Sequence, residues 1–262
     1  MFRKYLLLIS FLSFLTCPNG ISSQQKSDEE TLKGFDDFVA KVMSDWNIQG
    51  TAVAIIKNGK PVYMKGYGFR DVKNNLPVTV NTLFGIGSCT KAFTAAALCM
   101  LVDEGKMDLD KPVINYMPSF KLWDNYVTMN ITARDMLCHR SGLPGHDFVW
   151  YGTDFTRKEI VDNLQYLEAS QPFRTTFQYQ NLMFVTSGYL VEQVAGITWE
   201  EFVKSRIFTP LEMNTSDFSV IDMQKTDDYS KPYIEIKGKV KEIPYMNSLI
   251  LNKEIPHRNR SE

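Results

Sequence analysis

The sequence predicts an α/β protein of the α+β type, with an antiparallel sheet flanked by helices and a separate helical region. Two β-rich runs, residues 51–56 and 61–69, are joined at Asn58-Gly59, which is the strongest short signal for a tight hairpin. Helix-capping motifs dominate the middle of the chain. With 262 residues, 44% of them hydrophobic, the chain is long enough to bury a sizeable core.

The charge balance argues against a nucleic-acid partner. Lysine and arginine number 29 and aspartate and glutamate 30, so the net charge is −1. The sequence also has no long block of like charges that could bind along a phosphate backbone. A Walker loop and a dinucleotide-binding fingerprint are absent, so we expect no cofactor. His139, His146 and Asp147 could begin a metal site, but no further ligand cluster completes it, and we expect no metal.

The N-terminus has the layout of a secretory signal peptide over residues 1–23. Arg3 and Lys4 precede an apolar run over residues 5–15, and the small residues Ser22 and Ser23 follow. This run is too short to cross a bilayer. We therefore expect an exported protein, periplasmic or extracellular, with no membrane-spanning segment after signal removal.

The cysteines do not indicate a disulfide framework. Cys17 raises the possibility of a lipid anchor, but the Phe-Leu-Thr residues before it fit a lipobox poorly. After signal removal three cysteines remain, Cys89, Cys99 and Cys138, in a chain large enough to fold without disulfides. We interpret them as buried or incidental thiols.

The predicted elements follow one another as helix, strand, strand, helix. Polar residues 24–30 are typical of a linker, and apolar residues then recur at helical spacing from Phe35 to Trp46. The hairpin comes next. Residues 88–104 predict an alanine-rich helix, which Gly105 is placed to end.

Further helix starts follow, and a second hairpin is predicted after them. The helix-start residues are Thr132, Thr156, Asn181 and Thr198. Gly238 lies between two short β-rich runs, residues 233–236 and 240–243, whereas residues 251–262 form a polar tail without pattern. Because so few strands are predicted, and an isolated hairpin is barely stable in water, we expect the sheet to be incomplete.

The candidate nucleophile is Ser88, in the tetrad Ser88-Cys-Thr-Lys91 at the start of the alanine-rich helix. Residues three apart on a helix project to the same side, so the Lys91 amine can approach the Ser88 hydroxyl and accept its proton. The positive end of the helix dipole also favours a developing oxyanion. The tetrad alone is weak, because Ser23-Gln-Gln-Lys26 matches the same pattern in a polar linker.

A second candidate element is Tyr179-Gln-Asn181, at a predicted junction between loop and helix. A tyrosine beside a lysine can relay protons, and an asparagine can bind a substrate amide. The alternative is a structural one, in which Tyr179 is a core aromatic residue and Asn181 a helix cap. Tyr245-Met-Asn247 also has this spacing, and we interpret it as a chance match.

Residues 84–98, Phe-Gly-Ile-Gly-Ser-Cys-Thr-Lys-Ala-Phe-Thr-Ala-Ala-Ala-Leu, resemble the serine β-lactamase-related family of class C β-lactamases, DD-peptidases, D-aminopeptidases and esterases. Residues 137–144, Leu-Cys-His-Arg-Ser-Gly-Leu-Pro, resemble another signature of that family. Further similar segments are residues 101–110, 179–181, 187–190, 196–202 and 206–211. The resemblance runs from about residue 51 to residue 218, in order and at family spacing.

This resemblance implies a β-lactamase/transpeptidase-like fold and an acyl-enzyme mechanism on a peptide, ester or β-lactam-like substrate. It implies that Ser88 is the acylated nucleophile, Lys91 its proton acceptor, Tyr179 a proton shuttle and Asn181 a substrate contact. The residues alone left open a catalytic base at His139, whereas the resemblance implies only a structural part for it. The Tyr-Gln-Asn element resembles the class C and esterase branches more than class A enzymes, which carry Ser-Asp-Asn.

One family element is missing. The family carries Lys or His, then a small residue, then Gly, on a strand that lines the site, but the only Lys-x-Gly here is Lys57-Asn-Gly59 in the hairpin turn. We therefore expect the hydrolase domain, residues 31–250, to be incomplete at its C-terminus through truncation or a frame shift. The alternative function is a non-catalytic fragment or binding protein of the same fold.

Overall fold

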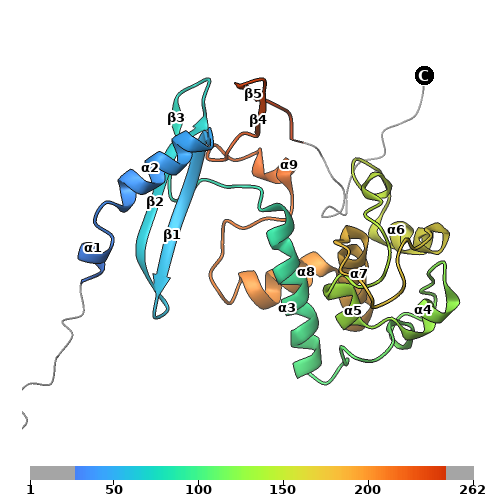
Figure 1. Ribbon diagram of the computed structural model, residues 1–262. Helices are drawn as coiled ribbons and strands as arrows, with labels where there is room; N and C mark the ends of the chain where they lie inside the picture. Colours follow the sequence, from blue (N-terminus) through green and yellow to red (C-terminus); the bar gives the residue numbers. More distant parts are fainter. Residues whose placement is uncertain (1–26, 246–262) are drawn as a thin grey trace, which may run out of the picture. The chain divides into compact units, whose positions relative to one another are not determined.

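The computed structural model describes residues 27–245, which fall into two compact units divided after Trp46 (Figure 1). The expected signal peptide, with Cys17, lies outside the described residues, as does the C-terminal tail. The first unit contains α1 (Asp28–Thr31), at the end of the expected linker, and α2 (Phe35–Asp45). Helix α2 confirms the helix predicted from its apolar spacing.

The second unit begins with the predicted hairpin, formed by β1 (Gly50–Lys57) and β2 (Lys60–Asp71). Asn58 and Gly59 have φ of 52° and 73°, the left-handed values that a tight turn of this kind requires. Strand β3 (Leu76–Pro77) adds to β2, so the order in this sheet is β1-β2-β3. Within the described residues, β1 has a strand partner on one side only.

The second predicted hairpin is also present, as β4 (Tyr233–Ile236) and β5 (Lys239–Glu242). Lys237 and Gly238 form its turn with φ of 53° and 72°. It makes a separate two-stranded sheet. The described residues therefore combine helices with small antiparallel sheets, an α/β arrangement that is consistent with the expected incomplete sheet.

The chain returns from the helical region to the strands through a polar junction at Asp228. Its carboxylate accepts hydrogen bonds from the hydroxyls of Thr79 and Thr82, both at 2.6 Å, and its carbonyl accepts one from the N–H of Leu83 at 2.9 Å. Nearby, Lys231 Nζ lies 2.9 Å from the carboxylate of Asp71 at the end of β2. These contacts fix the segment that leads into the nucleophile.

Helices fill the middle of the chain, as expected. They are α3 (Thr90–Asp103), α4 (Asn125–Asn130), α5 (Ala133–Leu137), α6 (Arg157–Asn163), α7 (Asn181–Ala195), α8 (Trp199–Val203) and α9 (Val220–Met223). Short helical turns between them are η1 (Gly87–Cys89), η2 (Val113–Asn115), η3 (Asp147–Val149), η4 (Leu164–Tyr166) and the π-helical η5 (Lys204–Phe208). The predicted capping boxes at Thr132, Thr156 and Thr198 are confirmed.

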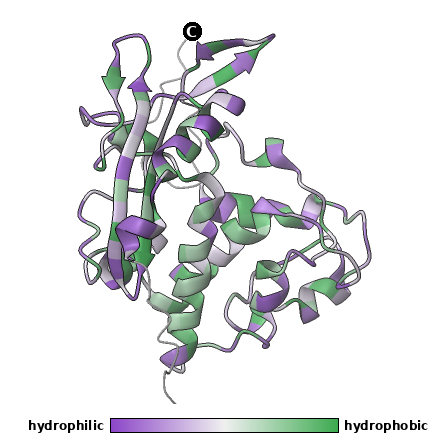
Figure 2. Cartoon of the chain, turned by 60° about the vertical axis from the view of Figure 1, so that its left-hand side comes forward, coloured by the Kyte–Doolittle hydropathy of each residue, from purple (hydrophilic) through white to green (hydrophobic). Residues whose placement is uncertain are grey.

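The core lies between α3 and α7, with α5, α6 and α8 around them. Helix α3 buries Leu98 and Leu101 completely, and α7 does the same with Leu182 and Leu190. In Figure 2, where the ribbon is coloured by residue hydropathy, the apolar stretches of the helices are green. Full burial of each leucine stabilises the fold by roughly 1.5–3 kcal/mol.

Two helix boundaries differ from the prediction. Residues 88–89 belong to the 3-10 turn η1 and not to α3, because Gly87 has a φ of 50° that an α-helix does not accept. Asn181 is the first residue of α7 and not its cap; the side chain of Gln180 caps the helix by accepting the N–H of Leu182 at 2.8 Å. Both differences lie at the candidate site.

Other predictions concern thiols, metals and membranes. Cys89, Cys99 and Cys138 are free and exposed, so of the two interpretations, buried or incidental thiols, burial is wrong. Over residues 27–245, no three His, Cys, Asp or Glu side chains are grouped so that they could hold a metal ion. None of the helices in this described part of the chain has the length and apolar character needed to span a membrane.

Candidate active site

The Ser88 hydroxyl lies at the surface, in the turn that leads into α3. Lys91, in the first turn of α3, donates a hydrogen bond from Nζ to Ser88 Oγ at 3.0 Å. Gly87, directly before Ser88, has a φ of 50°, a left-handed value that glycine adopts readily. The structure therefore places the two residues as the three-residue spacing predicts.

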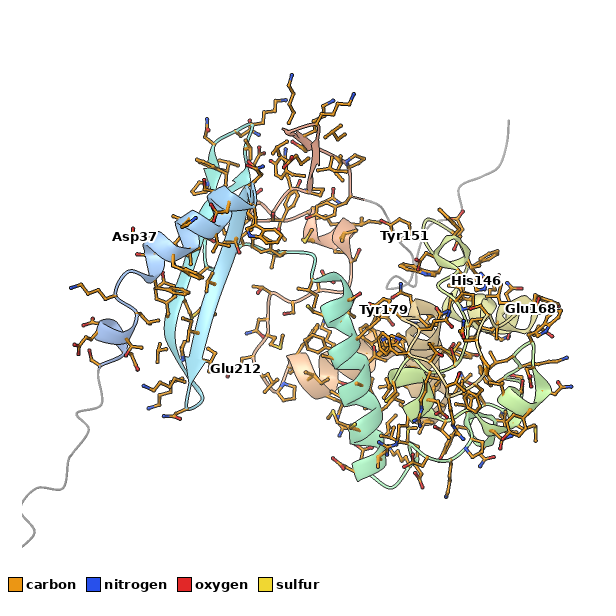
Figure 3. The ribbon with its side chains drawn as sticks, viewed as in Figure 1. Asp37, His146, Tyr151, Glu168, Tyr179 and Glu212 are labelled. Atoms are coloured by element: carbon orange, nitrogen blue, oxygen red, sulfur yellow. The ribbon has the colours of Figure 1, made fainter. Side chains whose placement is uncertain are left out.

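Tyr179 reaches the same serine from the other side of the helical region. Its hydroxyl donates a hydrogen bond to Ser88 Oγ at 2.6 Å, and Lys91 Nζ lies 4.8 Å from the centroid of its ring. Figure 3 shows Tyr179 next to α3, although 91 residues separate it from Ser88. Burial acts to raise the pKa of Tyr179, but hydrogen bonds with Lys91 and Ser88 outweigh burial and hold the pKa below its usual value.

Asn181 contacts the lysine and not the serine. Its Oδ1 accepts a hydrogen bond from Lys91 Nζ at 2.8 Å, while its Nδ2 donates to Asp147 Oδ1 at 3.1 Å. Lys91 therefore bridges the nucleophile and the asparagine. All four predicted site residues, Ser88, Lys91, Tyr179 and Asn181, belong to one continuous hydrogen-bonded chain.

His139 supports the Tyr179 segment. Its Nδ1 accepts the main-chain N–H of Gln180 at 3.0 Å, and its carbonyl accepts the N–H of Gln178 at 2.8 Å. The ring of His139 packs against Tyr179 with centroids 4.6 Å apart. Burial and the charge of Lys91 both lower the pKa of His139, which favours the neutral ring, whose Nδ1 can accept a hydrogen bond. This geometry matches a structural part and not a catalytic base or a metal ligand.

Sequence reasoning missed Gln180, which is completely buried between the two functional residues. Its amide nitrogen donates to the carbonyls of Leu143 and Pro144, and its amide oxygen caps α7. The position directly before a predicted helix start was the available signal, because a side chain there commonly caps the helix. Gln180 thus sets the helix start that presents Asn181.

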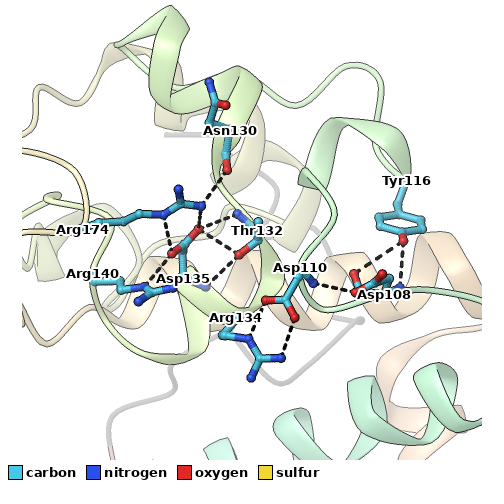
Figure 4. A network of polar contacts seen from close by, with 9 residues as sticks. All are labelled: Asp108, Asp110, Tyr116, Asn130, Thr132, Arg134, Asp135, Arg140 and Arg174. Atoms are coloured by element: carbon cyan, nitrogen blue, oxygen red, sulfur yellow. Dashed lines mark hydrogen bonds and ion pairs between the residues drawn. The ribbon is translucent and has the colours of Figure 1, made fainter.

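A buried carboxylate holds the loop that carries Tyr179 (Figure 4). Asp135 has no exposed side-chain surface; Arg140 Nε donates to its Oδ1 at 2.6 Å, and Arg174 Nη2 donates to its Oδ2 at 2.8 Å. The N–H of Arg174 also donates to the carbonyl of Arg140 at 2.9 Å. Burial acts to raise the pKa of Asp135, but hydrogen bonds from Arg174, Thr132 and Arg140 lower it overall.

A close contact between two backbone segments also holds the loop before Tyr179 in place. Gly142 has a φ of 83°, and a Cβ at that position would lie 2.2 Å from the carbonyl oxygen of Gln171. The carbonyl of Gly142 accepts hydrogen bonds from the N–H groups of Ser170 and Gln171, at 3.0 and 3.2 Å. Only glycine fits this contact, which brings residues 139–144 against the loop before Tyr179.

Comparison with known proteins identifies the family. The sequence profile of the family described as Beta-lactamase matches residues 35–244, which is more than half of the chain. The chain belongs to the beta-lactamase family. This confirms the resemblance that its signature segments carry.

Individual members of the beta-lactamase family agree with this assignment. The chain is 33% identical over 253 residues to "Unguisins hydrolase ungD'" of Aspergillus campestris, covering 92% of this chain and 45% of that protein. The octameric penicillin-binding protein homologue of Pyrococcus abyssi is similar with a TM-score of 0.71 and 32% identity, over 85% of this chain and 52% of that one. A class C beta-lactamase solved in complex with cefoxitin has a TM-score of 0.71 and 25% identity, over 86% and 61%.

The chain thus spans about half the length of the beta-lactamase relatives that it matches. In the part that the structure describes, the only Lys-x-Gly sequence is Lys57-Asn-Gly59, which occupies the β1–β2 turn. The family's strand with Lys or His, a small residue and Gly has no counterpart among residues 27–245. Ser88, Lys91, Tyr179 and Asn181 are nonetheless brought together by hydrogen bonds in the described residues.

Proposed function

We propose that this chain is a serine hydrolase that forms an acyl-enzyme on Ser88. The observation that carries this proposal is the convergence of Lys91 Nζ and Tyr179 OH on Ser88 Oγ, at 3.0 and 2.6 Å. Both distances allow direct proton transfer. Membership of the beta-lactamase family supports the same reaction class.

In the proposed reaction, uncharged Lys91 accepts the proton of the Ser88 hydroxyl as its oxygen attacks the carbonyl carbon of the substrate. The positive end of the α3 dipole favours the negative charge that develops on the carbonyl oxygen. Tyr179 relays this proton from Lys91 to the leaving group as the bond between the leaving group and the carbonyl carbon breaks. Water then hydrolyses the Ser88 ester, which releases the acid and restores the hydroxyl.

The substrate class that fits this chemistry is a peptide, an ester or a β-lactam-like compound. Two similar proteins support this range: a hydrolase named for unguisins and a class C beta-lactamase solved with cefoxitin. Asn181 is the proposed substrate contact, because one of its two amide hydrogens is used by Asp147 and the other is left for a substrate carbonyl. No cofactor or metal enters this reaction as proposed.

Export is a separate part of the proposal and rests on the signal-peptide layout of residues 1–23. The test is N-terminal sequencing of the protein recovered from the medium and the cell envelope. A mature N-terminus near Ser23 outside the cytoplasm supports export. An intact N-terminus in the cytoplasm contradicts it.

The central experiment measures the intact mass of the purified chain after exposure to a penicillin and to a fluorophosphonate. We expect an adduct that peptide digestion locates on Ser88, and we expect Ser88→Ala to remove it. Ser216→Ala is the matched control, since Ser216 is exposed and distant from Lys91 in sequence. Far-UV circular dichroism confirms that each variant is folded.

A second candidate function is a non-catalytic binding protein of the same fold. It is favoured by the lack of a Lys/His-x-Gly strand among the described residues, because losing an oxyanion donor typically costs about 10²–10³ in rate. A folded chain that gives no adduct with either probe would favour this candidate over the hydrolase. An adduct on Ser88 would reject it.

A further inference from the structure

The loop that contains η3 (Asp147–Val149) reaches the candidate active site with the carboxylate of Asp147. Asp147 Oδ1 accepts a hydrogen bond from Asn181 Nδ2 at 3.1 Å. On the far side of the same amide, Asn181 Oδ1 accepts from Lys91 Nζ at 2.8 Å. We propose that Asp147 is a positioning residue that fixes the orientation of the Asn181 amide and so keeps its oxygen on Lys91.

The chemistry of the two neighbours allows only one orientation of this amide. A carboxylate is only an acceptor, so Asp147 requires the amide nitrogen of Asn181, and this leaves the amide oxygen to accept an N–H of Lys91. A flipped Asn181 would place its amide oxygen against the Asp147 carboxylate. That contact would be repulsive, and the Lys91 N–H would lose its acceptor.

Asp147 is itself held in place by its own loop. His146 has φ and ψ of 46° and 40°, a left-handed conformation that turns the chain into η3. The main-chain carbonyl of Asp147 accepts the N–H of Tyr151 at 2.8 Å. Trp150 Nε1 donates to Asp147 Oδ1 at 3.1 Å, the oxygen that also faces Asn181.

The braced carboxylate can therefore orient a partner and does not simply follow it. Trp150 packs against the hydrophobic core, and its ring meets that of Tyr151 edge to face with centroids 5.2 Å apart. The hydrogen-bonded series runs Trp150, Asp147, Asn181, Lys91 and Ser88. Movement of Asp147 would be transmitted to the nucleophile through one asparagine.

This inference rests on the proposed function, because it assigns Asp147 a part in the same reaction. With one amide hydrogen of Asn181 bound to Asp147, the direction of the second hydrogen is also fixed. A substrate carbonyl then meets a donor that is already oriented, and Lys91 keeps a fixed position beside Ser88. Such preorganisation lowers the barrier to acylation.

The test compares Asp147→Ala with Asp147→Asn, which keeps an acceptor oxygen but loses the charge. Asp154→Ala is the matched control, because Asp154 is an exposed carboxylate of the same loop. We expect Asp147→Ala to lower the acylation rate by a reporter ester or β-lactam about tenfold, or ~1.4 kcal/mol. Asp147→Asn should stay within about threefold of the native rate, and Asp154→Ala should match it.

A double-mutant cycle separates positioning from general loss of structure. If Asp147 acts through Asn181, Asp147→Ala has no further effect on acylation in the Asn181→Ala background. An equal additional loss in that background would overturn the proposal. So would an Asp147→Asn variant as slow as Asp147→Ala, since charge and not the acceptor would then matter.

A second measurement does not depend on activity. With ¹⁵N-labelled asparagine, the side-chain NH₂ resonances of Asn181 are assigned by their loss in Asn181→Ala. We expect Asp147→Ala to shift them towards random-coil positions and Asp154→Ala to leave them unchanged. If native Ser88 is never acylated, the proposed function fails, yet unshifted Asn181 resonances in Asp147→Ala would still be the result that rejects the positioning role.

Discussion

The main-chain N–H of Gln180 donates a hydrogen bond to Nδ1 of His139 at 3.0 Å. Gln180 lies between Tyr179 and Asn181, so this one bond fixes the backbone from which both functional side chains project. The segment with His139 is thereby coupled to the nucleophile without touching it. This signature histidine therefore contacts the backbone of residues 178 and 180 in the structure.

The first prediction concerns the protonation of His139. Because burial and Lys91 lower its pKa, the folded state holds the ring neutral where the unfolded chain, with a pKa of 6.5, binds a proton. Its contribution to stability is complete above pH 6.5 and decreases as the pH falls below that value. Chemical denaturation between pH 8 and pH 5 measures this slope.

His139→Asn is the matched variant for this measurement, since an amide oxygen can accept the Gln180 N–H without titrating. We expect the free energy of unfolding of His139→Asn to change less with pH over this range than that of the native chain. Equal slopes would show that His139 does not titrate differently in the folded state.

The second prediction concerns the pair Lys91 and Tyr179. Lys91→Met removes the amine whose hydrogen bond lowers the pKa of Tyr179, so we expect this pKa to rise above its native value while burial continues to raise it. Tyrosinate absorbance, with Tyr179→Phe subtracted, measures the pKa. The same variant should slow acylation of Ser88 by about 10²–10⁴, the range for loss of a general base.

Lys111→Met is the control for this pair, because Lys111 is exposed and lies beyond the C-terminal end of α3. It should change neither the acylation rate nor the tyrosinate titration. An unchanged titration in Lys91→Met would contradict the proposed coupling between the amine and the phenol.

The third prediction concerns acid stability at the end of β2. Burial acts to raise the pKa of Asp71, but hydrogen bonds from Lys231 and Asn74 outweigh it and lower the pKa from 3.8 to about 2. The stability from this carboxylate is complete above pH 3.8 and is lost as the pH falls through about 2. Unfolding measured from pH 5 to pH 2 should therefore show a loss that Asp71→Asn lacks.

The fourth prediction compares two arginine–aspartate pairs in Figure 4. Arg174 pairs with Asp135, which is completely buried, whereas Arg134 pairs with Asp110 at the surface. We expect Arg174→Met to lower the free energy of unfolding by about 1–3 kcal/mol, because a buried carboxylate loses donors. Arg134→Met should cost only about 0–1 kcal/mol.

Urea denaturation of both arginine variants provides the comparison. The two variants remove the same side chain and differ in the burial of the partner carboxylate. Equal losses would contradict the prediction, since the contacts of buried Asp135 would then contribute no more to the free energy of unfolding than those of exposed Asp110.

The sequence could predict the elements whose conformation depends on neighbouring residues. The Asn58-Gly59 hairpin, the capping boxes at Thr156 and Thr198, and the approach of Lys91 to Ser88 all follow from backbone dihedrals and helix spacing. The family signatures could also be recognised in the sequence, because each consists of consecutive residues. The exact start of α3 could not be predicted, since it depends on the φ of Gly87.

Only the tertiary structure could decide which distant residues complete the candidate site. Tyr179 lies 91 residues from Ser88, and Asp147 lies 34 residues from Asn181, so no local pattern joins them. Packing of α3 against α7 brings the first pair together, and the left-handed turn at His146 delivers Asp147 to the second. Local chemistry fixes dihedral angles and near neighbours along the chain, whereas contacts between distant segments depend on burial of a shared core, which has no local signature.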